Sequence, residues 1–143
     1  MNTQSTHIQI AASFLWIGFV ASISFMEAWL KFTAPGVSLL EGLAIGQIVF
    51  DALNKVELAL ATVILVSYLF GDLRTLRNEW LVWIAFAIIV VQSIYILPTL
   101  SHRIDHYLAG KQVPSSPLHT VYVALEVVKI TVLFLYGFKQ LKK

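Results

Sequence analysis

The chain contains no cysteine, and only 13% of its 143 residues are charged. The first absence excludes disulfide bonds, thiolate nucleophiles, cysteine-ligated zinc and iron–sulfur clusters. The scarcity of charge is unlike soluble domains, in which about a quarter of the residues are charged. The chain is instead rich in apolar residues: 58% of it is hydrophobic, and its mean hydropathy is +0.78. These values predict an integral membrane protein that consists of a single domain.

Positive charge is sparse as well. The formal net charge is +2, and lysine and arginine are scattered along the chain rather than clustered. Several of them flank apolar segments, where the membrane–water interface accounts for them. We therefore expect the lipid bilayer to be a partner of the protein, and we expect no nucleic-acid partner.

Four apolar segments are each long enough to cross a hydrocarbon core of ~30 Å, which requires about 20 helical residues. We expect these spans at residues 8–30, 40–70, 80–100 and 118–138. A proline–glycine turn or a polar connection separates each span from the next, so consecutive helices are expected to be antiparallel neighbours. The predicted fold class is all-α, an integral membrane four-helix up-down bundle.

The connections between the spans predict the orientation of the chain. The longest polar loop is expected at residues 101–117, between the third and fourth spans. Five lysine and arginine residues lie on the side that holds both termini, and three lie on the other side. Because cytoplasmic loops carry the excess of positive charge, both termini are expected in the cytoplasm.

Polar side chains within the apolar segments are the candidates for function. An ionisable side chain inside a span costs about 2.5–3.5 kcal/mol on insertion scales, so such residues usually face the protein interior and have a use. His119, Tyr122, Glu126 and Lys129 are separated by three, four and three residues, which places them on one helical face. We expect a ligand- or ion-binding site in the half of the bundle remote from the termini. Its predicted residues are Glu27, Asp51, Asn54, Glu57, Tyr122, Glu126 and Lys129.

Three kinds of chemistry fit such a layer of polar residues. The acids could bind a cation or a proton in transit, since a carboxyl group in a low-dielectric bundle holds a proton firmly. His102 and His119 could instead ligate a divalent metal or hold a haem between helices. Alternatively, Lys31, Arg103 and Lys129 could bind a lipid or another anionic head group. The sequence leaves the cofactor, if any, undetermined between haem and a divalent metal.

A structural interpretation stands beside these three. Most of the acids have a lysine one helical turn away and could be neutralised locally. The protein would then be a structural subunit of a membrane complex. Four embedded acids nevertheless exceed what packing requires, which favours binding or transport of a small solute, ion or proton. The local pairs are Glu27–Lys31, Asp51–Lys55 and Glu126–Lys129.

Three runs of sequence resemble small uncharacterised bacterial four-span membrane families. The runs are WIGFVASISFMEAWLKFTAPG at residues 16–36, GLAIGQIVFDALNKVE at 42–57 and LHTVYVALEVVK at 118–129. The resemblance covers most of the chain. It implies membrane location and a four-helix bundle. We expect the membrane to be a bacterial inner membrane.

A second, partial resemblance concerns the second predicted helix. Ala52, Asn54 and Glu57 are similar to the glutathione-binding signature of the MAPEG family, the membrane-associated enzymes of eicosanoid and glutathione metabolism. That resemblance implies a glutathione-dependent membrane enzyme with four spans that assembles as a trimer. Asp51 stands where the family's motif carries an arginine, which reverses the charge offered to the peptide. A homo-oligomer or a larger membrane complex is expected in either case.

Overall fold

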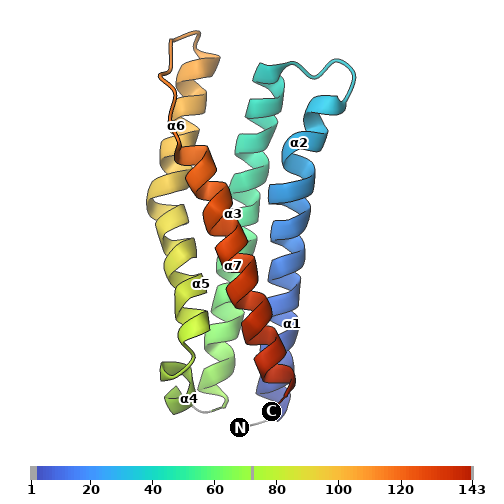
Figure 1. Ribbon diagram of the computed structural model, residues 1–143, viewed down its shortest axis with the longest axis vertical. Coiled ribbons are helices and arrows are strands. Elements are labelled where there is room, and N and C mark those ends of the chain that lie inside the picture. Colours follow the sequence, from blue (N-terminus) through green and yellow to red (C-terminus); the bar gives the residue numbers. More distant parts are fainter. Residues whose placement is uncertain (1–2, 72, 143) are drawn as a thin grey trace.

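The computed structural model describes residues 3–71 and 73–142, and no strand is found within these ranges. Long helical rods lie side by side along the longest axis of the molecule, and both chain ends lie at the same end of it (Figure 1). The first rod is continuous but changes its winding along its length. Its segments are α1 (Thr3–Val20), the π-helix η1 (Ala21–Glu27), α2 (Ala28–Leu30) and the 3₁₀-helix η2 (Lys31–Thr33).

The remaining rods follow in chain order. A turn at Gly36, whose φ of 83° lies in the left-handed region that favours glycine, separates the first rod from the second. The third rod, like the first, contains a π-helical segment. The segments are α3 (Leu39–Leu69), the short α4 (Leu73–Arg77), then α5 (Trp80–Val91), η3 (Gln92–Ile96) and α6 (Leu97–Leu108), and finally α7 (Leu118–Leu141).

Three of the described helical stretches are long and apolar enough to cross a membrane. They are Thr3–Thr33, Trp80–Leu108 and Leu118–Leu141; α3 is not among them. Large apolar side chains point outward, as at Phe70 and Ile94, which are each 75% exposed. The predicted all-helical class is confirmed for the described residues, and so is a membrane-length apolar helix at three of the four predicted spans. Lys143, one of the five positive residues on the side of the termini, lies outside them.

The third rod is longer than the sequence predicts. Helix α6 continues to Leu108, so the predicted loop at residues 101–117 is wrong over its first half. Side-chain contacts with α3 hold this extension in place, because Gln47 donates hydrogen bonds to Ser101 and, over 3.0 Å, to Asp105. Two polar residues that look like loop residues in the sequence are therefore interhelical contacts.

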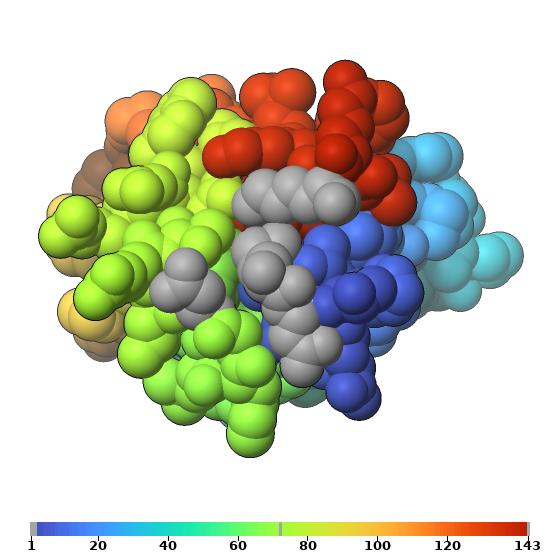
Figure 2. All heavy atoms as spheres, turned by 90° about the horizontal axis from the view of Figure 1, so that it is seen from below, coloured from blue at the N-terminus to red at the C-terminus, as the bar shows by residue number. Residues whose placement is uncertain are grey.

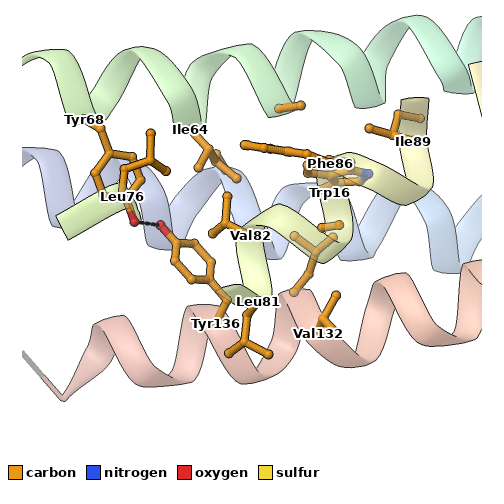
Figure 3. Packing of buried hydrophobic residues seen from close by; sticks show 14 of the residues in the cluster. Trp16, Ile64, Tyr68, Leu76, Leu81, Val82, Phe86, Ile89, Val132 and Tyr136 are labelled. Carbon is orange, nitrogen blue, oxygen red and sulfur yellow. Dashed lines mark hydrogen bonds between the residues drawn. The ribbon is translucent and has the colours of Figure 1, made fainter. Parts of the chain in front are cut away.

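The apolar core lies where α1, α3, α5 and α7 meet, toward the end that holds the termini. Trp16 stacks on Phe86 with ring centroids 6.5 Å apart. Ile64 and Val82, which are 0% and 1% exposed, lie next to this pair on the side of Tyr68 and Tyr136 (Figure 3). This apolar layer separates Trp16 from polar residues nearer the termini.

The first turn of α3 supports a test of local stability. Ser38 and Glu41 form a reciprocal capping box, in which the backbone N–H of Ser38 donates to Glu41 Oε2 over 2.7 Å. Hydrogen bonds from the Ser38 backbone and side chain lower the pKa of Glu41. A carboxyl group with a lowered pKa stabilises the fold above its unfolded-state pKa, and this contribution is lost as pH falls through the folded-state value.

We expect Ser38→Ala to destabilise the start of α3 by about 1 kcal/mol, the usual worth of an N-cap. Amide hydrogen exchange at Glu41 and Gly42, whose N–H groups bond to Ser38, measures the fraying after correction for intrinsic rates. In the wild type this protection should fall on acidification, whereas Glu41→Gln should remove the pH dependence. Unchanged acid sensitivity in Glu41→Gln would contradict the assignment.

Candidate functional site

A buried group of four polar side chains lies in the centre of the molecule, and we call it the carboxylate cluster: Glu57, Gln92, Glu126 and Lys129. The ammonium group of Lys129 contacts Glu57, lies 3.0 Å from Glu126 Oε1 and donates to Gln92 Oε1 over 2.7 Å. None of the four residues is more than 1% exposed. Three separate rods (α3, the third rod at η3, and α7) therefore converge on one cation.

Further donors complete the cluster. Trp16 on α1 donates its indole N–H to Glu57 Oε1 over 2.7 Å, and Gln92 donates its amide to Glu126 Oε1 over 2.9 Å. With both carboxyl groups ionised, two negative charges face the single positive charge of Lys129. Uncompensated charge is costly in a dry interior. The cluster is therefore suited to taking up one proton or another cation.

The π-helical segments lie beside the cluster. Gln92 is the first residue of η3, and the next residue, Ser93, also points inward and donates to Asn54 Oδ1 over 2.7 Å. Ser24, 6% exposed, lies in η1 on the first rod. Single π-turns are rare, and they occur frequently at functional sites because the wider turn redirects side chains. Here the wider turn allows two consecutive residues to face α3 and α7.

Three buried polar atoms beside the cluster lack a hydrogen-bond partner among the described residues. They are the hydroxyl groups of Tyr122 and Ser24 and the Oε2 atom of Glu126. Tyr122 is 2% exposed, and its hydroxyl group lies close to both Ser24 and Glu126 and interacts with them without a well-oriented hydrogen bond. An unpartnered buried polar atom costs about 1–3 kcal/mol. The three groups therefore lie together and satisfy one another incompletely.

A cavity of about 360 Å³ reaches Tyr122 from the end remote from the termini. Residues of α2, α3, α6 and α7 line it, and apolar side chains such as Leu43, Leu97 and Ile104 form much of its wall. Its volume lies within the range of about 300–1,000 Å³ that is typical of small-molecule sites. The cavity reaches Tyr122, and the other side of this tyrosine interacts with Glu126, so Tyr122 lies between the cavity and the carboxylate cluster.

Charged residues at the mouth of the cavity are paired with each other. Lys31 lies 3.2 Å from Glu27, and Lys55 lies 2.6 Å from Asp51. Lys31 crosses over Gly46, where an added Cβ would come within 2.9 Å of its ammonium nitrogen. A glycine at this position therefore makes room for the lysine. The mouth offers no uncompensated charge from these two pairs.

The structure brings together some of the predicted site residues and separates others. Glu57, Tyr122, Glu126 and Lys129 meet at the cluster, and Asn54 lines the cavity beside them. Asp51 is on the rim, with its side chain 63% exposed. Glu27 pairs with Lys31 near the same rim.

The two histidines considered as metal ligands do not meet. His102 contacts His106, with their Nε2 atoms 3.3 Å apart, whereas His119 lines the cavity. Over residues 3–71 and 73–142, no group of three or more histidine, aspartate or glutamate side chains is arranged to hold a metal ion. The described structure brings no further support to the predicted metal site.

Two members of the site were absent from the residues predicted from the sequence. Trp16 reads as a packing residue in an apolar helix, and Gln92 as an isolated polar residue in the third span. Each nevertheless carries a polar group within an apolar segment. A buried indole N–H or a buried amide requires a hydrogen-bond partner, and this requirement indicates a polar neighbour. The sequence alone does not say that these partners are the two carboxylates.

The carboxylate cluster and the cavity that reaches the neighbouring Tyr122 are the features from which a function can be argued. Both are built from residues of several rods, so they depend on the tertiary fold rather than on a local motif. No protein-family model, curated protein or solved structure matches the chain.

Proposed function

We propose that the four long helical rods cross a bacterial inner membrane as an up-down bundle, with both termini in the cytoplasm. Helix α3 has 31 residues, so at 1.5 Å per residue it is about 46 Å long and extends beyond a ~30 Å hydrocarbon core. Its charged residues are compatible with this position. Asp51 and Lys55 neutralise each other near the rim, and Glu57 is directed into the protein.

Within this bundle, the cavity binds a small amphipathic molecule without net charge, and the carboxylate cluster exchanges a proton at its inner end. The observation that carries this proposal is the buried hydroxyl group of Tyr122, which lines the cavity and forms no well-oriented hydrogen bond within the described chain. A hydroxyl or carbonyl group of the ligand would bond to it, while the ligand's apolar body would contact the cavity wall. The paired charges at the mouth favour a neutral ligand.

The cluster supplies the proton chemistry. Glu126 Oε1 accepts hydrogen bonds from Gln92 and Lys129, whereas its Oε2 accepts none from the described residues. A proton on Oε2 would neutralise the excess negative charge of the cluster and would create a donor toward Tyr122, which in turn lines the cavity. Protonation of Glu126 and occupation of the cavity are therefore expected to support each other.

Photolabelling in lipid nanodiscs tests the binding site, with a diazirine derivative of octanol as the probe. We expect crosslinks at cavity residues of α3 and α7, with competition by octanol but not by octane. Tyr122→Phe should weaken labelling about tenfold, since a hydrogen bond is worth about 1–1.5 kcal/mol. The double variant Leu43→Trp/Leu97→Trp should abolish it by obstructing the cavity.

The matched control places the same two tryptophans on the outer surface. Ile48→Trp/Ile94→Trp changes residues that are 72% and 75% exposed, and it should leave cavity labelling unchanged. Crosslinks spread evenly over outward-facing residues, or labelling insensitive to the cavity variants, would overturn the proposed function.

A further inference from the structure

The buried face of α7 is polar along almost its whole length. A membrane helix that serves only for packing would present small or apolar residues to its neighbours. On α7, polar side chains instead recur every three or four residues, and only one turn of the stripe, at Val132 and Leu133, is apolar. The buried residues are Tyr122, Glu126, Lys129, Val132, Leu133, Tyr136, Gly137 and Gln140.

The lower part of this stripe belongs to a second polar group, which lies near the termini and is distinct from the carboxylate cluster. The hydroxyl groups of Tyr68 and Tyr136 are 2.8 Å apart (Figure 3). Glu79 is 2% exposed, and Lys139 donates to it over 2.8 Å. The side chain of Lys139 is 46% exposed, so this ion pair reaches the surface.

Two buried amide side chains extend the second polar group. Gln9 and Gln140 are 0% and 1% exposed; neither amide forms a well-oriented hydrogen bond within the described chain, and Gln140 lies close enough to Tyr136 to interact with it. A Cβ on Gly137 would meet Ser13 at 3.5 Å, so α1 and α7 touch there. Gln9 and Gln140 each lie about one turn nearer the termini, hence at the same level on facing helices. Buried amides of this kind are commonly satisfied by a water molecule, which itself makes two to four hydrogen bonds.

An apolar layer separates the two polar groups. It contains Ile64, Val82 and Leu133, none of which is more than 1% exposed, and Figure 3 shows Ile64 and Val82 between Trp16 and the tyrosine pair. From Lys129 to Tyr136 the distance along α7 is about 10 Å, at 1.5 Å per residue. The layer is thus thin enough for a short chain of water molecules to bridge.

We infer that the protein conducts protons across the membrane, through two polar half-paths separated by the apolar layer. On the cavity side, a proton is accepted by the carboxylate cluster. On the side of the termini, it is passed to water held by Gln9 and Gln140 and leaves beside Glu79 and Lys139. The apolar layer acts as the seal, since protons cross it only when water enters. This inference deepens the proposed function, because both use the carboxylate cluster.

The end of the molecule at which this route emerges is seen from below in Figure 2, where the first turns of α1, the end of α7 and the region around α4 come together. The route therefore ends among segments that are far apart in the sequence. It uses no co-reactant, because the proton gradient or the membrane potential provides the driving force.

Proton flux into liposomes tests the inference, with the purified full chain, trapped pyranine and a valinomycin-clamped potassium potential. Val82→Thr keeps the shape of the side chain but adds a hydroxyl group to the seal. We expect it to raise proton influx roughly tenfold, the equivalent of about 1.4 kcal/mol off a barrier. Leu133→Ser is a second variant of the seal with the same expected direction. Gln9→Leu/Gln140→Leu should reduce the influx to that of empty liposomes, also in the Val82→Thr background.

The control is Phe134→Ser, which adds a hydroxyl group at a residue of α7 that is 50% exposed and should leave the flux unchanged. Octanol photolabelling of the same variants reports the cavity separately. If labelling persists while the seal variants fail to raise the flux, or while the glutamine variants fail to lower it, the proton path is wrong and the binding site stands. Loss of labelling with altered flux retained would contradict the proposed function instead.

Discussion

We expect Lys129→Met to lower the free energy of unfolding by about 3–5 kcal/mol, the usual cost of removing one partner from a buried ion pair. Lys129 is 0% exposed and holds two carboxylates that come from different helices. Without it, Glu57 and Glu126 would be two buried acids with no cation between them. Equilibrium unfolding in mixed detergent micelles measures this change in free energy. The loss of the helical circular dichroism signal monitors the unfolding.

The matched control is Lys55→Met, which breaks an ion pair on the rim. Lys55 and Asp51 have side chains that are 72% and 63% exposed, and such pairs are worth about 0–1 kcal/mol. The triple variant Lys129→Met/Glu57→Gln/Glu126→Gln should recover most of the lost stability, since it leaves no charge within the cluster. Equal losses for Lys129→Met and Lys55→Met would show that the cluster is not an ion pair in a dry interior.

Trp16 should show the second large effect. We expect Trp16→Ala to cost about 3–5 kcal/mol, because it removes a fully buried ring that stacks on Phe86. Trp16→Phe keeps an aromatic ring but removes the N–H that donates to Glu57, and should cost about 1–3 kcal/mol. The same unfolding measurement separates the packing contribution of the indole from that of its hydrogen bond.

A double-mutant cycle with Glu57 identifies the hydrogen bond. In the Glu57→Gln background the cost of Trp16→Phe should shrink, since hydrogen bonds to charged groups are the stronger ones. Trp29→Phe, at a residue 58% exposed, should change stability by less than about 0.5 kcal/mol. A Trp16→Phe cost that is independent of residue 57 would assign the whole effect to packing.

Part of this site could be predicted from the sequence. The spacing of Tyr122, Glu126 and Lys129 places them on one face of a helix whatever the helix packs against. Ionisable residues in an apolar helix are directed inward because lipid cannot solvate them. These two arguments identify the α7 side of the cluster without knowledge of its neighbours.

The α3 side could not be predicted in the same way. Asp51 and Glu57 are six residues apart in one helix, and both are acids in an apolar surrounding. Only the packing of the other rods decides that Glu57 is 1% exposed while the Asp51 side chain is 63% exposed. Asp51 has a lysine one turn away in its own helix, whereas Glu57 obtains its cation from α7.

The π-turn at η3 also could not be predicted from the periodicity of the sequence. In a regular α-helix, Gln92 and Ser93 would point about 100° apart. The wider turn lets Gln92 contact Lys129 while Ser93 contacts Asn54. Its position depends on the fit between the third rod and its neighbours, so the composition of the segment does not reveal it.

The resemblance to glutathione-dependent membrane enzymes stays a prediction, as does a homo-oligomer. Such an enzyme would bind glutathione through Asn54 and Glu57, and in the structure both residues already have partners. Glu57 is bound to Trp16 and Lys129, and Asn54 accepts a hydrogen bond from Ser93. Glutathione would have to displace these partners to bind the two residues.

The hydrogen bond from Trp16 to Glu57 also places a chromophore against the charged cluster. The transition energy of an indole responds to the local electric field, and neutralising a carboxylate 2.7 Å from its nitrogen changes that field. The other three tryptophans, Trp29, Trp80 and Trp83, are 46–62% exposed and lie outside the cluster. With these three replaced by phenylalanine, the fluorescence emission maximum of Trp16 would report changes in the charge of the cluster. Such a measurement can be made in the intact bilayer and in real time.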